Sequence, residues 1–451
     1  MGVSDETAEL VIEGLASGGR GVARQDGLVW LVDGAVPGDR VLAVARLRRP
    51  RLVEGRVLRL IEPAPVRRAS PCPIQGRCGG CPWMVLPEAE QRGWKRRIVV
   101  DALERVGGLL GVSVLEPIAS PRSLGYRNKV ELSFGRTEDG RRVLGYHGSD
   151  PSGDLVDVER CLLQDDGANT ILDLARSFFL DGPGAEARVL FDPGHPMRLV
   201  LRRSELSGSL LAAFRGPGGP FPEIEEFARI ARERSPGLAS IVRIVGEEGR
   251  RGGARTIAAA GEAWMEERLG GIVFRLPATS FLQVNPGAAE LLCSLIADLA
   301  GPVQEVDVLE LYGGVGAFSL TLARRGARAE VCETDREAVE CGRRAAREHG
   351  DLPVRYVRSD VGRFLHARGG HGRPGLVIAD PPRRGLGKGV AEGIAALRPG
   401  RILLVSCDPA TLARDARGLV ARGYAVRQVV PVDMFPQTPH VEAVMLLERR
   451  A

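Results

Sequence analysis

Lysine is almost absent from this sequence of 451 residues. Lys95, Lys129 and Lys388 are its only lysines, so arginine supplies nearly all of the 62 basic side chains. The opening segment, MGVSDETAEL, lacks the basic start and the apolar run of a secretory signal. No apolar stretch has the length of a membrane span. These absences predict a soluble, cytoplasmic protein without a membrane partner.

A disulfide framework is also missing. Eight cysteines in a chain without a secretory signal argue against one. The six histidines show no metal-binding spacing, and no segment repeats with a fixed period. Cys293, Cys332 and Cys341 lie in apolar helix or strand patterns, where a small core side chain is the simplest interpretation. A tight group of cysteines near residue 75 needs a different explanation.

Positive charge is concentrated towards the N-terminus. Residues 1–100 hold 16 basic and 11 acidic side chains, a surplus equal to the net charge of +5 of the whole chain. Nine arginines lie within 40–68, against Glu54 and Glu62. A local basic face suits a polyanion such as a nucleic acid. A merely solvated face explains the charge equally well.

The sequence divides into three regions that differ in their hydrophobic pattern. Short apolar runs between glycine turns at about 8–62 predict a β-barrel of OB type over 1–66, a fold that commonly binds nucleic acids. Mixed strands and helices predict an α+β domain over 67–270. Within it, an acidic opening, a basic middle and apolar spacing predict a helix over 86–107. A helix over about 88–118 is expected to pack on the C-terminal domain. Apolar strands alternating with helices predict an α/β domain with a doubly wound, mainly parallel sheet over 271–451.

A glycine-rich turn in VDVLELYGGVGAFSL separates a predicted strand from a helix. Gly314 and Gly316 allow close approach of a ligand to the backbone, and Glu333 after the next strand can accept hydrogen bonds from ribose hydroxyls. Ser319 stands where a dinucleotide fingerprint has its third glycine. Asp380 in IADPPRRGL ends a later strand at the same edge of the sheet. Together these residues favour S-adenosylmethionine over a dinucleotide.

Three cysteines form the pattern CxxxxxCGGC at Cys72, Cys78 and Cys81. Thiolates at this spacing suit an iron–sulphur cluster and also zinc. Zinc sites usually have two paired CxxC units, and the sequence has no second such pair, so the spacing favours the cluster. Radical S-adenosylmethionine enzymes use a CxxxCxxC pattern, which the five-residue gap does not match.

Seven motifs, in order along the chain, resemble those of the RNA uracil-C5 methyltransferases, which make 5-methyluridine in ribosomal or transfer RNA. They are CPIQGRCGGCPW, LGYRNKVELSFG, FLQVNPG, LELYGGVGAF, ADPPRRGL, VSCDPATLARD and VDMFPQTPHVEAVMLLER. The resemblance covers essentially the whole chain. It implies an N-terminal TRAM domain, a central domain with a 4Fe–4S cluster and a Rossmann-like methyltransferase domain that binds S-adenosylmethionine.

The resemblance also implies roles for individual residues. Cys407 is the expected nucleophile, Glu442 the expected base, and Asp380 a contact of the uracil or the cofactor. The expected cofactor contacts are Gln283, Tyr312, Gly314, Gly316, Glu333, Asp360 and Asp380. The expected cluster ligands are Cys72, Cys78, Cys81 and Cys161.

The chemistry needs these groups because C5 of uracil is a poor nucleophile. A thiolate that adds to C6 makes C5 able to attack a methyl group, and a base must then remove the C5 proton. A stacked target base must first be flipped into the pocket. Tyr126, Arg127 and Lys129 are candidates for RNA binding, and a strand with a solvated face explains them about equally well. His440 is a candidate for contact with the substrate, with a hydrogen-bonded loop histidine as the alternative.

Two departures from the family pattern stand out. Asp408 replaces the usual asparagine after the nucleophile, and a carboxylate aimed at the sulphur would disfavour the thiolate. Gly313 and Ala317 replace residues that are often cysteine and a polar residue, so one cofactor contact is expected to be missing.

Several alternatives stay open. The three-part organisation favours 23S ribosomal RNA as the substrate, with transfer RNA as the alternative. A non-catalytic RNA-binding or folding factor would not need Cys407 and Glu442, and an amino-group methyltransferase would not need the thiol. No obligate protein partner is expected, and the protein is predicted to be a monomer.

Overall fold

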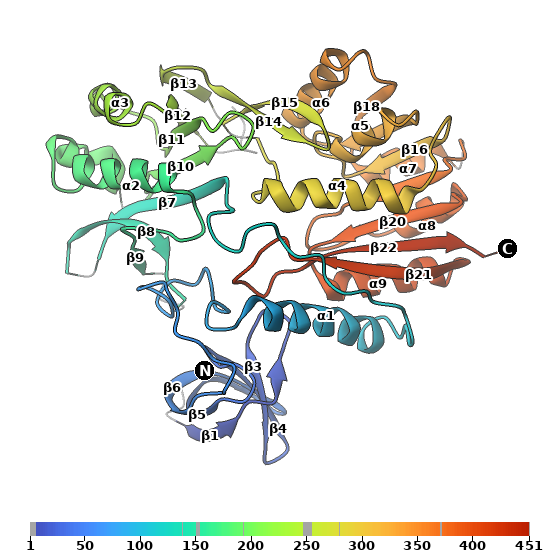
Figure 1. The fold of residues 1–451 in the computed structure, drawn as a ribbon, viewed down its shortest axis with the longest axis horizontal. Coiled ribbons are helices and arrows are strands. Elements are labelled where there is room, and N and C mark those ends of the chain that lie inside the picture. Colours follow the sequence, from blue (N-terminus) through green and yellow to red (C-terminus); the bar gives the residue numbers. More distant parts are fainter. Residues whose placement is uncertain are drawn as a thin grey trace.

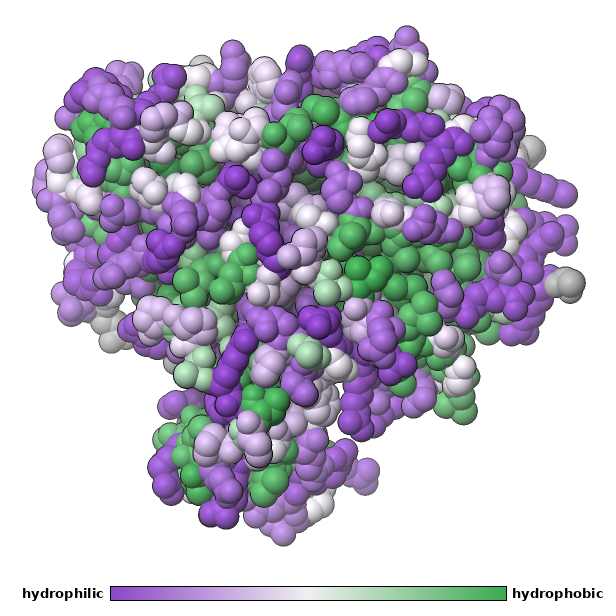
Figure 2. Space-filling view, viewed as in Figure 1, coloured by the Kyte–Doolittle hydropathy of each residue, from purple (hydrophilic) through white to green (hydrophobic). Residues whose placement is uncertain are grey.

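The computed structural model describes residues 6–137, 139–149, 154–192, 194–246, 255–278, 280–369 and 372–450. Its strands form three large sheets and one separate hairpin (Figure 1). Within the described ranges, no helix combines the length and apolar character needed to cross a membrane. Figure 2 shows hydrophilic side chains over most of one face, with smaller hydrophobic patches between them.

The N-terminal sheet has six strands in the order β1-β5-β6-β4-β3-β2. They are β1 (Thr7–Val11), β2 (Gly14–Leu15), β3 (Gly21–Gln25), β4 (Leu28–Asp33), β5 (Arg40–Arg49) and β6 (Leu52–Glu62). Five of these strands supply one core, which includes Leu10, Ala23, Trp30, Val41 and Val53. Because β1 at one end of the order and β3 near the other end share this core, the sheet is rolled. An OB-type barrel is rolled in the same way.

Most of the predicted basic face is neutralised within the fold. Arginines of 40–68 that lie within 4 Å of a carboxylate are Arg40, Arg46, Arg48, Arg49, Arg67 and Arg68. Arg51, Arg56 and Arg59 are exposed. The surplus of arginine in the sequence therefore overstates the positive charge that this sheet offers to a polyanion.

Helix α1 (Glu88–Arg105) agrees with the helix predicted over 86–107 and ends well before residue 118, so the longer range of 88–118 is wrong. Gly108 has a φ of 65°, which favours glycine and stops the helix. The chain then runs beside β21 (Tyr424–Val432), where Val114 pairs with Val429 and Ile118 with Val432. The apolar face of α1 packs on α9 (Pro409–Val420), so α1 does contact the C-terminal domain as predicted.

The central sheet has seven strands in the order β13-β12-β11-β10-β7-β8-β9. The strands are β7 (Lys129–Arg136), β8 (Arg142–His147), β9 (Leu155–Asp157), β10 (Arg198–Arg203), β11 (Leu210–Gly216), β12 (Leu238–Val245) and β13 (Arg255–Ala260). Helices α2 (Asp166–Phe179) and α3 (Glu223–Arg234) cover one face, with 3-10 turns at Pro183–Glu186 and Arg188–Phe191. A cluster of phenylalanine rings fills the space between sheet and helices. This arrangement is α+β.

The C-terminal sheet has the order β18-β17-β16-β19-β20-β22-β21, and its first five strands are parallel. Its other strands are β16 (Asp307–Leu311), β17 (Arg328–Glu333), β18 (Val354–Arg358), β19 (Leu376–Ala379), β20 (Arg401–Ser406) and β22 (Glu442–Arg449). The helices are α4 (Pro286–Ala300), α5 (Ala317–Ala323), α6 (Arg336–Glu348), α7 (Val361–Arg368) and α8 (Val390–Ala396), with α9. Parallel strands that alternate with helices confirm the predicted Rossmann-like class.

The hairpin of β14 (Trp264–Leu269) and β15 (Ile272–Pro277) precedes this sheet. Its side chains Leu269 and Phe274 belong to the same core as α4 and α5. The expected domain limit at 270/271 falls in the turn of this hairpin. The domain limits remain predictions, and the shared core argues for moving this one to before β14.

Candidate active site

A cavity of about 660 Å³ opens at the carboxyl ends of the parallel strands. Predicted site residues that line it are Gln283, Tyr312, Gly314, Glu333, Asp360, Asp380, Cys407 and Glu442. The carboxyl edge of such a sheet is where ligands bind in this class of fold. Residues that are far apart in the sequence therefore meet because their strands end at one edge.

The glycine-rich loop between β16 and α5 forms one wall of the cavity. Tyr312 and Gly314 have φ values of 59° and 53°. Gly316 shapes this loop without lining the cavity. Its φ is 76°, and a Cβ there would lie 2.5 Å from the hydroxyl of Tyr356, which donates a hydrogen bond of 2.8 Å to the carbonyl of Val315.

Gly313 also has a steric reason to be glycine. A Cβ at this position would lie 2.5 Å from Val331 Cγ1 and 3.2 Å from Glu310 Cγ. A larger residue would require the strands to separate, because packed side chains cannot give way by that distance. The departure from the family pattern at Gly313 therefore matches the packing around it.

Two carboxylates fix the loop and the start of α5 by accepting hydrogen bonds from backbone amides. Glu333 Oε2 accepts a hydrogen bond of 2.9 Å from the amide of Gly314. Glu310 Oε2 accepts one of 2.8 Å from the amide of Ser319, and burial raises the pKa of Glu310 to about 7. Glu310 lines the cavity too, although the sequence reasoning missed it. The available signal was a charged residue inside the apolar run VDVLELY.

Glu442 and Cys407 meet because of the register between β20 and β22. These antiparallel strands pair Ser406 with Ala443, so Cys407 follows β20 where Glu442 begins β22. Glu442 is only 3 % exposed, and its Oε1 atom has no hydrogen-bond partner among the described residues. Burial, with the nearby charge of Asp380, raises the pKa of Glu442 well above the usual range. Burial also raises the pKa of Asp380.

The thiol of Cys407 is half-buried at the tip of β20. Burial raises its pKa, the Glu442 carboxyl raises it further, and the guanidinium of Arg383 opposes both effects. Arg383 comes from ADPPRRGL and lines the cavity. A cation beside a thiol favours the thiolate, so Arg383 belongs among the functional candidates that the sequence reasoning missed.

Asp408 caps helix α9 and does not accept a hydrogen bond from the thiol. Its Oδ1 atom accepts a hydrogen bond of 2.8 Å from the amide of Thr411. The carboxylate is thus engaged at a helix N-terminus, which favours negative charge. An asparagine would cap the helix in the same way, which explains why either residue fits here.

Phe281 and His440 also line the cavity. Phe281 is 74 % exposed, and no pattern in the sequence marks it out as exposed. His440 packs edge-on to Phe435, and burial lowers the pKa of His440 to about 4. The imidazole is therefore neutral near pH 7 and can offer one donor and one acceptor.

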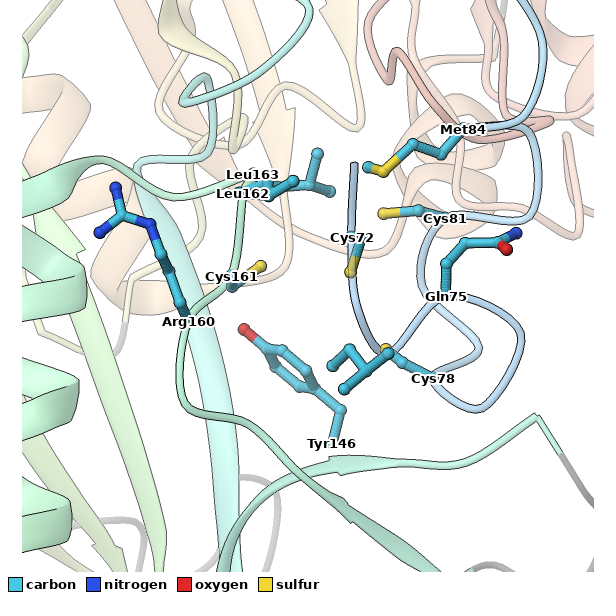
Figure 3. Close-up of a pocket in the computed structure, with 11 residues that line it drawn as sticks. Cys72, Gln75, Cys78, Cys81, Met84, Tyr146, Arg160, Cys161, Leu162 and Leu163 are labelled. Carbon is cyan, nitrogen blue, oxygen red and sulfur yellow. The ribbon is translucent and has the colours of Figure 1, made fainter. Parts of the chain in front are cut away.

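Four cysteines surround a second, much smaller cavity of about 30 Å³. Figure 3 shows Cys72, Cys78, Cys81 and Cys161 around one space, with Tyr146 and Met84 at its sides. Burial and the neighbouring thiols raise the pKa values of Cys78 and Cys81, the latter to about 12. No group of three or more His, Cys, Asp or Glu side chains in the described chain is arranged to hold a metal ion.

Tyr126 does not lie on the surface, in contrast to the expectation that it grips RNA. Its side chain is fully buried, and its hydroxyl donates a hydrogen bond of 3.0 Å to the carbonyl of Pro436. Arg127 is half-buried near the cysteines, where its charge partly opposes the rise in the pKa values of Cys78 and Cys81.

Comparison with known proteins gives a consistent group of relatives. A family model described as tRNA (uracil-5-)-methyltransferase matches residues 373–450. A Gloeobacter violaceus protein described as an uncharacterized RNA methyltransferase is 36 % identical, over 98 % of this chain and 97 % of its own. One with the same description from Nitratidesulfovibrio vulgaris is 34 % identical, over 98 % and 96 %.

A solved structure matches 98 % of this chain. It is the tRNA (uracil-54, C5)-methyltransferase of Pyrococcus abyssi in complex with S-adenosyl-L-homocysteine. The TM-score is 0.73 and the identity 24 %, over 98 % of this chain and 100 % of the other. At this level of identity the likeness concerns the fold.

Proposed function

Because the chain belongs to the RNA uracil-C5 methyltransferase family, we propose that it methylates C5 of a uridine in structured RNA through a covalent adduct on Cys407. S-adenosylmethionine supplies the methyl group when bound. The observation that carries this proposal is that Cys407, Glu442 and Asp380 line one cavity with the glycine-rich loop. A thiol, a buried acid and a nucleotide-type loop have no joint use in amino-group methylation.

The cavity has room and suitable chemistry for the cofactor. About 660 Å³ is within the range of small-molecule sites. The residues that would hold S-adenosylmethionine are Gln283, Tyr312, Gly314, Glu333 and Asp360. Glu333 is at the end of β17. Its carboxylate can accept hydrogen bonds from ribose hydroxyls in addition to the one from the Gly314 amide.

The thiol of Cys407 starts the reaction by adding to C6 of the uracil as a thiolate. Arg383 favours this form against the effect of burial. The addition gives C5 its nucleophilic character, and C5 then takes the methyl group. Asp380, with its raised pKa, can donate a hydrogen bond to a uracil oxygen in its neutral form.

Glu442 completes the cycle by removing the proton from C5. The electrons of the broken C–H bond re-form the C5–C6 double bond, and the thiolate leaves C6. A carboxylate with a raised pKa is a stronger base than an exposed one, which suits this task. Its Oε1 atom makes no hydrogen bond within the described protein and is therefore available to the substrate.

The proposed RNA is 23S ribosomal RNA, with transfer RNA as the alternative. The N-terminal sheet, which we propose is a TRAM domain, and the cysteine-rich central part support the ribosomal substrate by their resemblance to the large-subunit enzymes. The test compares methyl transfer from labelled S-adenosylmethionine to unmodified 23S RNA and to unmodified transfer RNA. Sequencing of 5-methyluridine in RNA from a deletion strain then identifies the nucleotide.

A covalent trap tests the reaction class. RNA that carries 5-fluorouridine has no C5 proton to remove, so the enzyme should remain attached to it after methyl transfer. A complex that survives denaturing electrophoresis is the expected result. Methylation of an amino group in the absence of such a complex would exclude the proposal.

We also propose that Cys72, Cys78, Cys81 and Cys161 hold a 4Fe–4S cluster. These four thiols share one cavity with apolar neighbours such as Met84 and Leu163. A cluster spreads its ligands over several irons, so the sulphurs need not converge on one point at about 2.3 Å as around zinc. The cluster would be structural, because the proposed reaction contains no electron transfer. Iron and sulphide analysis of anaerobically purified protein tests this, and zinc in place of iron would contradict it.

A further inference from the structure

The loop at 433–441, between β21 and β22, carries His440 and leads directly into Glu442. Connecting loops usually lie on the surface. This one is largely buried: Met434 and Asp433 are at most 1 % exposed, as are Gln437 and Val441. Its polar groups must therefore find partners inside the protein.

Gln437 is the most highly connected residue of this loop. Its side-chain Oε1 accepts a hydrogen bond of 2.9 Å from Gln91 Nε2, and its backbone amide donates one of 2.7 Å to Gln91 Oε1. Its Nε2 donates to Glu88 Oε1 at 3.2 Å and to the Ser123 carbonyl at 3.3 Å. Its own carbonyl accepts 3.1 Å from the amide of Trp83.

The backbone of Gln437 adds an independent sign of constraint. Its φ is 69°, in the left-handed region that non-glycine residues rarely adopt. The surrounding contacts must hold this conformation in place. A glutamine is needed for the reciprocal pair with Gln91, which a glycine could not form.

The partners of the loop come from every other part of the chain. Lys95 of α1 donates to Asp433 at 2.5 Å and to the Phe435 carbonyl at 2.9 Å. Tyr126, which packs against the cysteine-lined cavity, donates to the Pro436 carbonyl.

Trp83, whose amide donates to Gln437, also connects the loop to the N-terminal sheet. It follows Cys81 by two residues and donates from its indole to the carbonyl of Gly19. A Cβ at Gly19 would lie 2.8 Å from Pro439, so the N-terminal sheet reaches the loop as well.

We infer that Gln437 is a positioning residue for Glu442: through Gln91, Glu88 and Trp83 it sets the place of the loop that ends in the proposed base. The inference rests on the proposed function, because it concerns the C5 proton that Glu442 removes. It gives the N-terminal sheet, the cysteine-containing segment and α1 a common mechanical role at the active site.

Gln437→Ala should slow proton removal more than any earlier step. We expect kcat to fall roughly 10-fold to 100-fold, because a small misplacement of a reacting group has an effect of this size. The KM for S-adenosylmethionine should change less than about two-fold. The glycine-rich loop is held by Glu333 and Glu310, and not by the loop that contains Gln437. Covalent complex with ordinary uridine RNA should accumulate, as the adduct forms but resolves slowly.

Two further variants keep the inference testable if Gln437→Ala folds poorly. Gln91→Ala removes the reciprocal partner and should give the same accumulation, and the double variant should be little worse than either single one. Tyr126→Phe removes one hydroxyl and keeps the ring in the core. The matched control is Gln304→Ala, an exposed glutamine before β16, which should behave as wild type.

The readouts separate this inference from the proposed function. If wild-type protein forms no complex with 5-fluorouridine RNA, the proposed function fails. If wild type forms the complex but Gln437→Ala and Gln91→Ala resolve uridine adducts at the wild-type rate, only the positioning role fails. A fall in kcat together with weaker cofactor binding and no accumulated adduct would also overturn it, because that pattern indicates general loosening.

Discussion

The cavity at the strand tips and the cavity of the four cysteines put the same side chain into opposite surroundings. Cys407 lies in a cavity of about 660 Å³ with carboxyls and the guanidinium of Arg383 around it. The thiols of Cys72, Cys78, Cys81 and Cys161 surround a cavity of about 30 Å³, next to tyrosine, methionine and leucine side chains. The first volume is within the range of small-molecule sites, whereas the second leaves room for little beyond a compact inorganic group.

The difference lies in what opposes the burial of charge. Burial raises the pKa of Cys407, yet Arg383 favours its thiolate directly. Around Cys81 the thiols of Cys161 and Cys78 add to the effect of burial and each outweighs the opposing charge of Arg127, so a positive centre among them would favour the thiolates. The proposed nucleophile and the proposed metal ligands therefore differ in their neighbours, so the informative variants change one neighbour or one thiol.

Removing the proposed nucleophile, Cys407, should have the largest effect. Cys407→Ala is expected to lower methyl transfer by about 10⁴-fold or more, as for other covalent nucleophiles, and to abolish the 5-fluorouridine complex. RNA binding should persist in a filter or mobility-shift assay. The matched control is Cys341→Ala, a buried thiol outside the cavity. Methylation by Cys407→Ala at more than a few per cent of the wild-type rate would exclude the thiol mechanism.

Glu442→Gln should come next. We expect kcat to fall about 10²-fold to 10⁴-fold, the usual contribution of a general base, with covalent complex accumulating on ordinary uridine RNA. The wild-type rate should rise with pH as Glu442 loses its proton, over a range above the usual carboxyl pKa. The variant should lose this acid limb. A complex that still resolves at the wild-type rate would assign the base to another residue.

The same substitution should stabilise the protein. A carboxyl with a raised folded pKa binds its proton more tightly in the folded state, so folding loses stability as pH rises towards that pKa. The cost is absent below the unfolded pKa and complete above the folded one. Glu442→Gln should thus melt higher than wild type at pH 8 by roughly 2–4 °C per kcal/mol gained. The difference should vanish near pH 4.

How much of this site the sequence predicts depends on how local the signal is. Cys407, Asp380 and Glu333 follow apolar strands, and strand ends of a parallel sheet share one edge, so their meeting follows from the pattern. Glu442 meets Cys407 through the antiparallel insertion of β22, which apolar runs alone do not reveal. Only the family resemblance brought these two residues together before the structure.

Contacts between segments that are distant in the sequence could not be predicted from sequence patterns. The pair of Gln91 and Gln437 spans 346 residues, and neither residue stands in a pattern that suggests a buried amide. The pairing of arginines such as Arg40 and Arg48 with carboxylates depends on strand register, so the charge count could not show it. The early end of α1, by contrast, was readable from the two glycines at 107 and 108.

Replacing one cysteine by serine in each cavity should have opposite effects on iron content and on activity. Cys161→Ser should lose iron and lower the melting temperature by roughly 5–10 °C, if the cluster binds only the folded chain. Its methyl transfer should fall only several-fold at low temperature. Cys407→Ser should keep full iron and wild-type stability while losing activity. Equal iron content in both variants would contradict the cluster proposal.

The smallest effect concerns Asp408. Because its carboxylate caps α9 through Thr411, Asp408→Asn keeps the cap and should change kcat by less than about two-fold. A carboxylate aimed at the sulphur would instead make the asparagine variant distinctly faster at neutral pH, as the Cys407 thiolate became easier to form. Asp408→Ala should cost about 1 kcal/mol of stability. The exposed cap Asp335, replaced by alanine, gives the matched comparison of melting temperature, since it holds α6 in the same way.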